Sequence, residues 1–132
     1  MKMIIGGKHV EAADKKTFDV IAPATMKKID TVPAATKADV DGAIENARKG
    51  AKEWADVPMY QRIEAVYRFA DLLEQPEHFK ILVELEIEEN GKPISMAEED
   101  IHVSAYICRA FAEKARNFSG DIIPAASEPG TR

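Results

Sequence analysis

The stretch TKADVDGAIENARKGAKEWADVP, residues 36–58, decides the fold, because the hydrophobic pattern changes there from that of strands to that of a helix. Thr36 can cap the free backbone amides of a first helical turn, and Asp39 can reach back to it. Apolar residues then recur every three or four positions, and Pro58 prevents the helix from continuing. We therefore expect a helix here, with Trp54 anchoring its apolar stripe in the core. The stripe consists of Val40, Ala43, Ile44, Ala47, Ala51 and Trp54.

Residues 1–35, upstream of this helix, have the pattern of two short β-hairpins. In MIIGGKHVEA, residues 3–12, two extended runs flank Gly6-Gly7, a pair that can adopt the positive φ of a tight turn. TFDVIAPAT and KKIDTV, residues 17–25 and 27–32, supply a second pair, which we expect to end before Pro33. No other strands are expected before the helices.

Residues 58–117, downstream, predict three further helices. The second begins at Pro58, buries Ile63, Val66, Ala70 and Leu73, and ends at QPE, residues 75–77. The third, EHFKILVELEIEE, residues 77–89, turns Phe79, Leu82, Val83 and either Leu85 or Ile87 inward. The fourth, from about Pro93 to Asn117, carries Ile101, Ala105, Cys108, Ala112 and Ala115 on one stripe.

The expected fold class is therefore α+β for the isolated chain, as a single segment spanning residues 1–132. Hairpins occupy residues 1–35 and helices occupy residues 36–118. Residues 119–132 have the composition of a strand followed by a loop.

The stretch ENGKPIS, residues 89–95, admits three interpretations. A phosphate-binding loop needs several glycine amides after a strand, whereas Pro93 removes an amide here and the preceding residues have a helical period. Asn90-Gly91 suits a hairpin turn, but both flanks are helical. We expect the third interpretation, in which Gly91 adopts the left-handed conformation that ends one helix and Pro93 opens the next.

The composition argues against several classes of partner. The net charge is −5 and the pI is about 5.2, whereas nucleic acids and anionic membranes attract an excess of Lys and Arg. We expect neither partner, and no apolar run approaches the roughly 20 residues that span a bilayer. MKMIIGGKHVEAAD, residues 1–14, turns polar too soon for a signal peptide, so the expected location is the cytoplasm.

No group of residues in the sequence predicts a catalytic centre. Cys108 lies on an apolar stripe, which favours a buried structural thiol, and His102 lies about 240° away around the same helix. The acidic run at residues 98–100 suits a solvated helix start better than a pair of catalytic carboxylates. Single histidines offer no metal-ligand spacing, and no G-x-G-x-x-G follows a strand. The residues by themselves indicate a scaffold.

Six pieces of the sequence, taken in order, resemble the N-terminal segment of the NAD(P)-dependent aldehyde dehydrogenases. They are IGGKHVEA, FDVIAPAT, TVPAATKADVDGAIENARKGAKEWADVP, RIEAVYRFADLLE, ELEIEENGKP, and GDIIP followed by EPGTR. The resemblance implies that the chain is part of an α/β fold and belongs to its cofactor-binding domain. Two departures are the APATM run, where the family usually has Asn-Pro-Ala-Thr-Gly, and Pro76 in a helical connection that is usually continuous.

The resemblance also implies what the parent enzyme does and what this chain lacks. The family oxidises an aldehyde through a cysteine thiohemiacetal and passes hydride to NAD or NADP. Its catalytic cysteine, general-base glutamate, oxyanion asparagine and cofactor-binding turn are expected beyond residue 132, so this chain alone should bind no cofactor and be inactive. Some members bind a monovalent cation through backbone carbonyls at positions matching Val20, Ile21 and Glu89.

The expected partners follow from the apolar stripes on the helices. In the family these helices cover a sheet that this chain does not contain, so the chain should form a homo-oligomer or bind the remainder of the enzyme. The alternative is a stand-alone, non-catalytic interaction or assembly module, or the product of a truncated gene.

Overall fold

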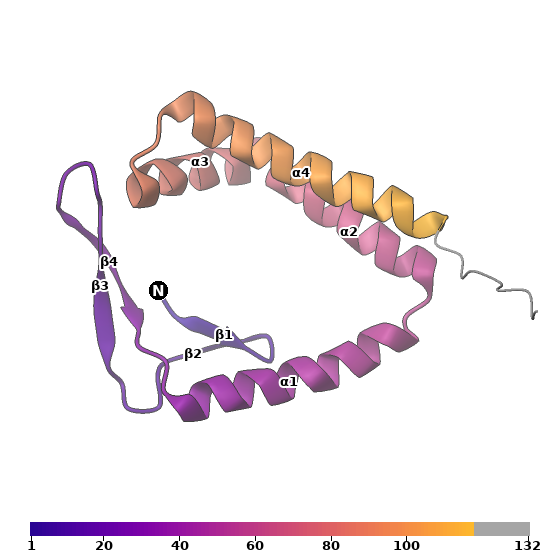
Figure 1. Ribbon diagram of the computed structural model, residues 1–132, viewed down its shortest axis with the longest axis horizontal. Helices are drawn as coiled ribbons and strands as arrows, with labels where there is room; N and C mark the ends of the chain where they lie inside the picture. Colours follow the sequence, from indigo (N-terminus) through magenta and orange to yellow (C-terminus); the bar gives the residue numbers. More distant parts are fainter. Residues whose placement is uncertain (118–132) are drawn as a thin grey trace, which may run out of the picture.

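The computed structural model describes residues 1–117, in which two strand pairs are followed by four helices (Figure 1). The strands are β1 (Met3–Ile5), β2 (Lys8–Val10), β3 (Thr17–Ile21) and β4 (Lys28–Pro33). The helices are α1 (Lys37–Asp56), α2 (Met59–Leu73), α3 (Pro76–Asn90) and α4 (Ile94–Arg116). This order confirms the expected fold class, and the strand or loop expected at residues 119–132 lies outside the described residues.

Both strand pairs are antiparallel hairpins. Gly6 and Gly7 have φ of 58° and 72°, the positive values expected for the tight turn between β1 and β2. β3 and β4 pair over their full lengths, with an irregularity between Val20 and Ile21. β4 runs one residue further than expected, because Pro33 pairs with Thr17 at the end of the strand, where proline is tolerated.

The start of α1 has the expected capping box. The backbone N–H of Thr36 donates to Asp39 Oδ2 at 2.8 Å, and the backbone N–H of Asp39 donates to Thr36 Oγ1 at 3.3 Å. Asp39 Oδ2 also accepts from the backbone N–H of Ala13 at 3.1 Å, which attaches the loop after β2 to the helix. These backbone hydrogen bonds, from Thr36 first and then Ala13, hold the pKa of Asp39 below its ordinary value.

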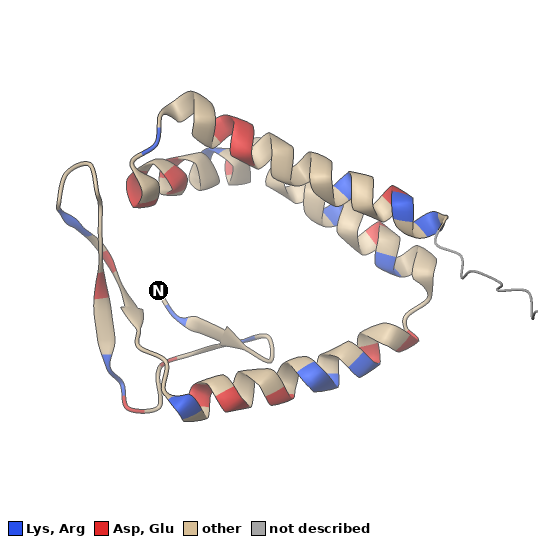
Figure 2. Ribbon diagram, viewed as in Figure 1, with Lys and Arg blue, Asp and Glu red and all other residues tan. Residues whose placement is uncertain are grey.

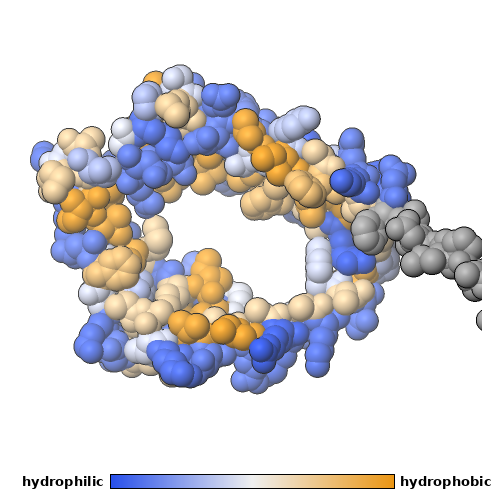
Figure 3. All heavy atoms as spheres, viewed as in Figure 1, coloured by the Kyte–Doolittle hydropathy of each residue, from blue (hydrophilic) through white to orange (hydrophobic). Residues whose placement is uncertain are grey.

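The expected burial of α1 is wrong for this chain. No residue of α1 is buried, and Trp54 is 46% exposed, so it does not anchor a core. The reason is spatial: α1 lies across an opening from α2, α3 and α4, and the hairpins close the ring on the other side (Figure 1). Apolar residues line the side of α1 that faces this opening (Figure 3). The stripe exists, and β1 contacts α1, but the described elements bury none of its residues.

The core lies among α2, α3 and α4. Val83, Ala97 and Ile101 form a buried cluster. The half-buried residues packed against this cluster are Leu73, Phe79, Leu82 and Ile87. Ile87, rather than the 38% exposed Leu85, is thus the inward residue of that pair. α4 lies along α2 (Figure 1), and fully buried alanines such as Ala70 and Ala105 allow close approach of the two backbones.

The ENGKPIS stretch is the expected joint between two helices. Gly91 has φ 70° and ψ 19°, and its backbone N–H donates to the carbonyl of Ile87 at 2.9 Å. Pro93 is the residue before the first turn of α4. A Cβ placed on Gly91 would lie 3.2 Å from Pro23 Cγ, so the turn between β3 and β4 touches this joint. This contact closes the ring between the second hairpin and the helices.

The charged residues divide unevenly along α4 (Figure 2). Acidic residues, Glu98 to Asp100, lie near its start, and Lys114 and Arg116 lie in its last turn. Basic residues there are favourable because the C-terminal end of a helix carries partial negative charge. Within residues 1–117 no helix combines the length and the apolar content that crossing a bilayer requires.

Candidate functional site

The residues of the expected cation site lie in two segments that the structure brings together. Val20 and Ile21 are the last residues of β3, beside the irregularity in the strand pairing. Glu89 is in the last turn of α3, two residues before the glycine that touches Pro23. A pocket of about 440 Å³ lies between the β3–β4 hairpin and the end of α3. Lys27, Lys28, Ile87 and Glu88 are among its lining residues, and Val20, Ile21 and Glu89 are not.

The carbonyls at the end of α3 favour a cation at this place, whereas Lys27 and Lys28 in the pocket lining oppose one. The last carbonyls of a helix have no intrahelical partner, and the negative end of the helix dipole favours positive charge. Among the described residues, no group of His, Cys, Asp and Glu side chains is arranged to hold a metal ion. A cation here would therefore depend on backbone oxygens, and binding through Val20, Ile21 and Glu89 stays a prediction.

A cluster of ionised side chains joins the end of α2 to the middle of α4. Arg109 donates from Nη1 to Glu74 Oε2 at 2.6 Å and from Nη2 to Asp71 Oδ1 at 2.7 Å. His102 Nδ1 lies 3.0 Å from Glu74 Oε1, and Nδ1 must carry the proton because a carboxylate only accepts. The ring of His102 packs on Phe79 with centroids 4.8 Å apart. We refer to Asp71, Glu74, His102 and Arg109 as the α2–α4 cluster.

The α2–α4 cluster was not expected from the sequence, although a spacing signal existed. Asp71 and Glu74 are three residues apart, and His102 and Arg109 are seven apart, so each pair lies on one side of its helix. Nothing in the sequence showed that these two sides face each other. His102 is engaged here, which agrees with excluding it as a base for Cys108.

The pKa of Glu74 is lowered in this cluster. Hydrogen bonds from His102 and then Arg109 hold the pKa of Glu74 below its ordinary value of 4.5. A carboxylate with a lowered folded pKa contributes stability at pH values above its unfolded pKa. That contribution is lost as the pH falls through the folded pKa.

The Glu74→Gln variant tests this shift. At pH 7 we expect its urea midpoint to lie below that of the parent chain, because glutamine cannot accept charge-assisted bonds from both partners. The difference should shrink as the pH falls below 4.5. Urea unfolding followed by circular dichroism at intervals from neutral to acid pH measures it. Glu64→Gln is the control, since Glu64 on α2 makes no ion pair or hydrogen bond within residues 1–117. If both variants showed the same dependence of the urea midpoint on pH, the expectation would be contradicted.

A second cluster holds the joint between α3 and α4. Lys92 Nζ lies 2.5 Å from Asp100 Oδ2 and 2.8 Å from Glu86 Oε2. Hydrogen bonds to Asp100 and then Glu86 raise the pKa of Lys92. Lys92 therefore joins the acidic end of α3 to the acidic start of α4, and Asp100 is an ion-pair partner rather than only a solvated residue. Like the α2–α4 cluster, this one is paired internally and offers no nucleophile or base.

Cys108 is half-buried rather than fully buried. It lies on α4, and no histidine in the described chain forms a hydrogen bond with its thiol. A nucleophilic thiolate needs such a base or a positive helix N-terminus. The structure thus brings together no catalytic pair around this residue.

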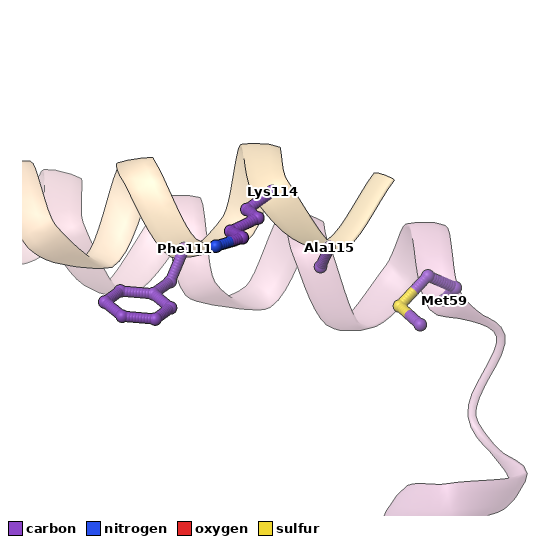
Figure 4. Close-up of a pocket in the computed structure, with 4 residues that line it drawn as sticks. All are labelled: Met59, Phe111, Lys114 and Ala115. Carbon is purple, nitrogen blue, oxygen red and sulfur yellow. The ribbon is translucent and has the colours of Figure 1, made fainter. Parts of the chain in front are cut away.

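An apolar pocket of about 310 Å³ lies between the start of α2 and the end of α4 (Figure 4). Met59, Phe111 and Ala115 line it, and Lys114 is its charged neighbour. Phe111 is 69% exposed, so the pocket is an open surface groove. Its chemistry suits an apolar side chain of another element.

The family comparison matches almost the whole chain. The model of the aldehyde dehydrogenase family covers residues 9–132. The chain is also similar to an NAD-dependent benzaldehyde dehydrogenase from Corynebacterium glutamicum, with 35% identity and a TM-score of 0.87 over 96% of this chain and 27% of that one.

Two further solved structures are similar to this chain. One is a betaine aldehyde dehydrogenase from Staphylococcus aureus in complex with NAD+, with 30% identity and a TM-score of 0.88 over 96% of this chain and 26% of that one. The other is an NADP-dependent glyceraldehyde-3-phosphate dehydrogenase from Bacillus halodurans, with 28% identity and a TM-score of 0.90 over 99% of this chain and 27% of that one. The chain thus spans about a quarter of the length of these enzymes.

Proposed function

The chain belongs to the aldehyde dehydrogenase family, and we propose that it forms the N-terminal scaffold of an enzyme that oxidises an aldehyde to a carboxylic acid with NAD or NADP. The observation that carries the proposal is the match of nearly the whole chain to one quarter of complete enzymes. Relatives with NAD and relatives with NADP are both similar to it, so the proposal extends to either cofactor.

The proposed role within the enzyme is to support the remainder of the fold. α1 has an apolar stripe with no buried residue, and the faces of α2 and α4 around Met59 and Phe111 are open. Such surfaces favour contact with further secondary structure. The remainder of an enzyme of family length would supply that contact, together with the nucleophile, the oxyanion donors and the cofactor.

Residues 1–132 alone should not catalyse the reaction. The barrier to aldehyde oxidation falls only when nucleophile, oxyanion donors and cofactor are held in one site. In both ionic clusters of the described chain the charged side chains are held in ion pairs with one another, and no histidine there forms a hydrogen bond with Cys108. With an aldehyde and either NAD or NADP, absorbance at the nicotinamide band should rise no faster than without protein. A faster rate that Cys108→Ala abolishes would contradict this.

The size of the native polypeptide tests the proposal as a whole. An antibody raised against residues 1–132 should detect, in the source cells, a polypeptide roughly four times as long as this chain, as the coverage of the relatives implies. Aldehyde-dependent reduction of NAD or NADP should co-purify with it. A native polypeptide of 14.6 kDa without such activity would favour the stand-alone module instead.

A further inference from the structure

The chain exposes more surface than a closed protein of its mass. Its accessible area is 10725 Å². A compact monomer of 14.6 kDa would expose roughly 6,900 Å² by the usual scaling with mass. Allowing roughly 2,400 Å² for residues 118–132, counted as fully exposed, still leaves an excess on the order of an extensive protein–protein interface. The chain by itself therefore has area to bury.

α4 carries much of this unburied apolar surface as a second stripe. Val103, Ile107 and Phe111 follow one another at intervals of four residues, and they are 43%, 46% and 69% exposed. Residues four apart lie on one side of a helix. This stripe lies about 120° around α4 from the buried row that includes Ile101 and Ala105. A helix with apolar residues on several sides is typically covered on several sides.

The stripe is complementary to itself when two copies of α4 run antiparallel about an axis through Ile107. Val103 of one copy then faces Phe111 of the other, because both are four residues from the centre. Asp100 and Lys114 are both seven residues from the centre, so the acidic start of one helix lies beside the basic end of the other (Figure 2). A parallel arrangement would instead place like charges together.

We propose that residues 1–132, as a separate chain, form a two-fold dimer in which the exposed stripes of α4 pack antiparallel, centred on Ile107. The groove beside Phe111 and Met59 continues the stripe toward the end of α4 and adds apolar area to the contact (Figure 4). The occupant is a second copy because, across that centre, apolar Val103 faces apolar Phe111 and acidic Asp100 faces basic Lys114. The dimer does not depend on the proposed enzymatic role.

Sedimentation equilibrium at micromolar concentration is the first test. We expect a species of twice the 14.6 kDa mass of one chain. Ile107→Glu places two like charges at the axis and should weaken dimerisation at least about tenfold. Glu98→Gln, on the opposite side of α4, should leave it unchanged. A monomer, or a dimer whose affinity Ile107→Glu does not change, overturns the proposal. An unchanged circular dichroism spectrum of the variant shows that it still folds.

Cross-linking and charge exchange test the antiparallel register. With Cys108→Ser as background, Ile107→Cys should form an intermolecular disulfide and Glu98→Cys should not. Lys114→Glu should weaken the dimer, because it places an acidic side chain beside Asp100 of the second copy. An unweakened Lys114→Glu dimer together with no Ile107→Cys cross-link overturns the register. A monomer would leave the enzymatic proposal standing, whereas a short native polypeptide would count against that proposal and not against the dimer.

Discussion

Replacing Ile101 by alanine should lower the free energy of unfolding by about 2–4 kcal/mol. Ile101 is 8% exposed and lies in the buried cluster with Val83 and Ala97, so the change removes methyl groups from packed surroundings and leaves a cavity. The small alanines along the α2–α4 contact cannot expand to fill that space. Urea unfolding followed by circular dichroism, at one protein concentration, measures the loss.

Ile94→Ala is the matched control for this change. Ile94 begins the same helix but is 60% exposed, and both substitutions replace isoleucine by alanine. Its effect should stay within about 0.5 kcal/mol. Equal losses at the two positions would show that the cluster of α3 and α4 is not the core of this chain.

Replacing Gly91 by alanine should cost about 1–2 kcal/mol from its left-handed conformation alone, and more from crowding. The added Cβ would lie 3.2 Å from Pro23 Cγ, so the turn between β3 and β4 must shift. The substitution therefore acts on the end of α3 and on the contact that closes the ring. The same unfolding measurement reports the combined effect.

Two other glycines separate the two causes. Gly7 also has positive φ, 72°, but no neighbour within 4 Å of an added Cβ, so Gly7→Ala should show the conformational cost alone. Gly50 lies in α1 with open space around it, and Gly50→Ala should stabilise the helix by up to about 1 kcal/mol. A Gly91→Ala loss no larger than that of Gly7→Ala would mean that the contact with Pro23 contributes nothing.

Features that depend on neighbouring residues could be predicted from the sequence. The capping box of Thr36 and Asp39 and the left-handed Gly91 each follow from the chemistry of a few adjacent positions, and the structure has both. The hairpin turn at Gly6-Gly7 follows in the same way. The order of two hairpins and four helices likewise followed from hydrophobic period and from the Gly and Pro positions between the elements.

Features that depend on residues far apart in the sequence could not be predicted from it. The apolar stripe ending at Trp54 predicted burial wrongly, because burial needs a covering element and the described elements bury no residue of α1. The α2–α4 cluster needs the facing of two helices, which spacing along one helix does not determine. The expected cation site, which stays a prediction, needs the end of β3 near the end of α3. Residue patterns did not place these two ends together, whereas the contact of Pro23 with Gly91 does.

That contact between residues 23 and 91 also bears on the entropy of loop closure. If the intervening chain were fully flexible, bringing these residues together would cost roughly 4 kcal/mol, more than one small apolar contact provides. The intervening chain instead contains β4 and three helices, joined by short connections at residues 34–36, 57–58 and 74–75. Few backbone torsions remain to be restricted when the ring closes. The stiffness of α1 therefore lowers the entropic cost of the contact between Pro23 and Gly91, even though α1 has no buried residue.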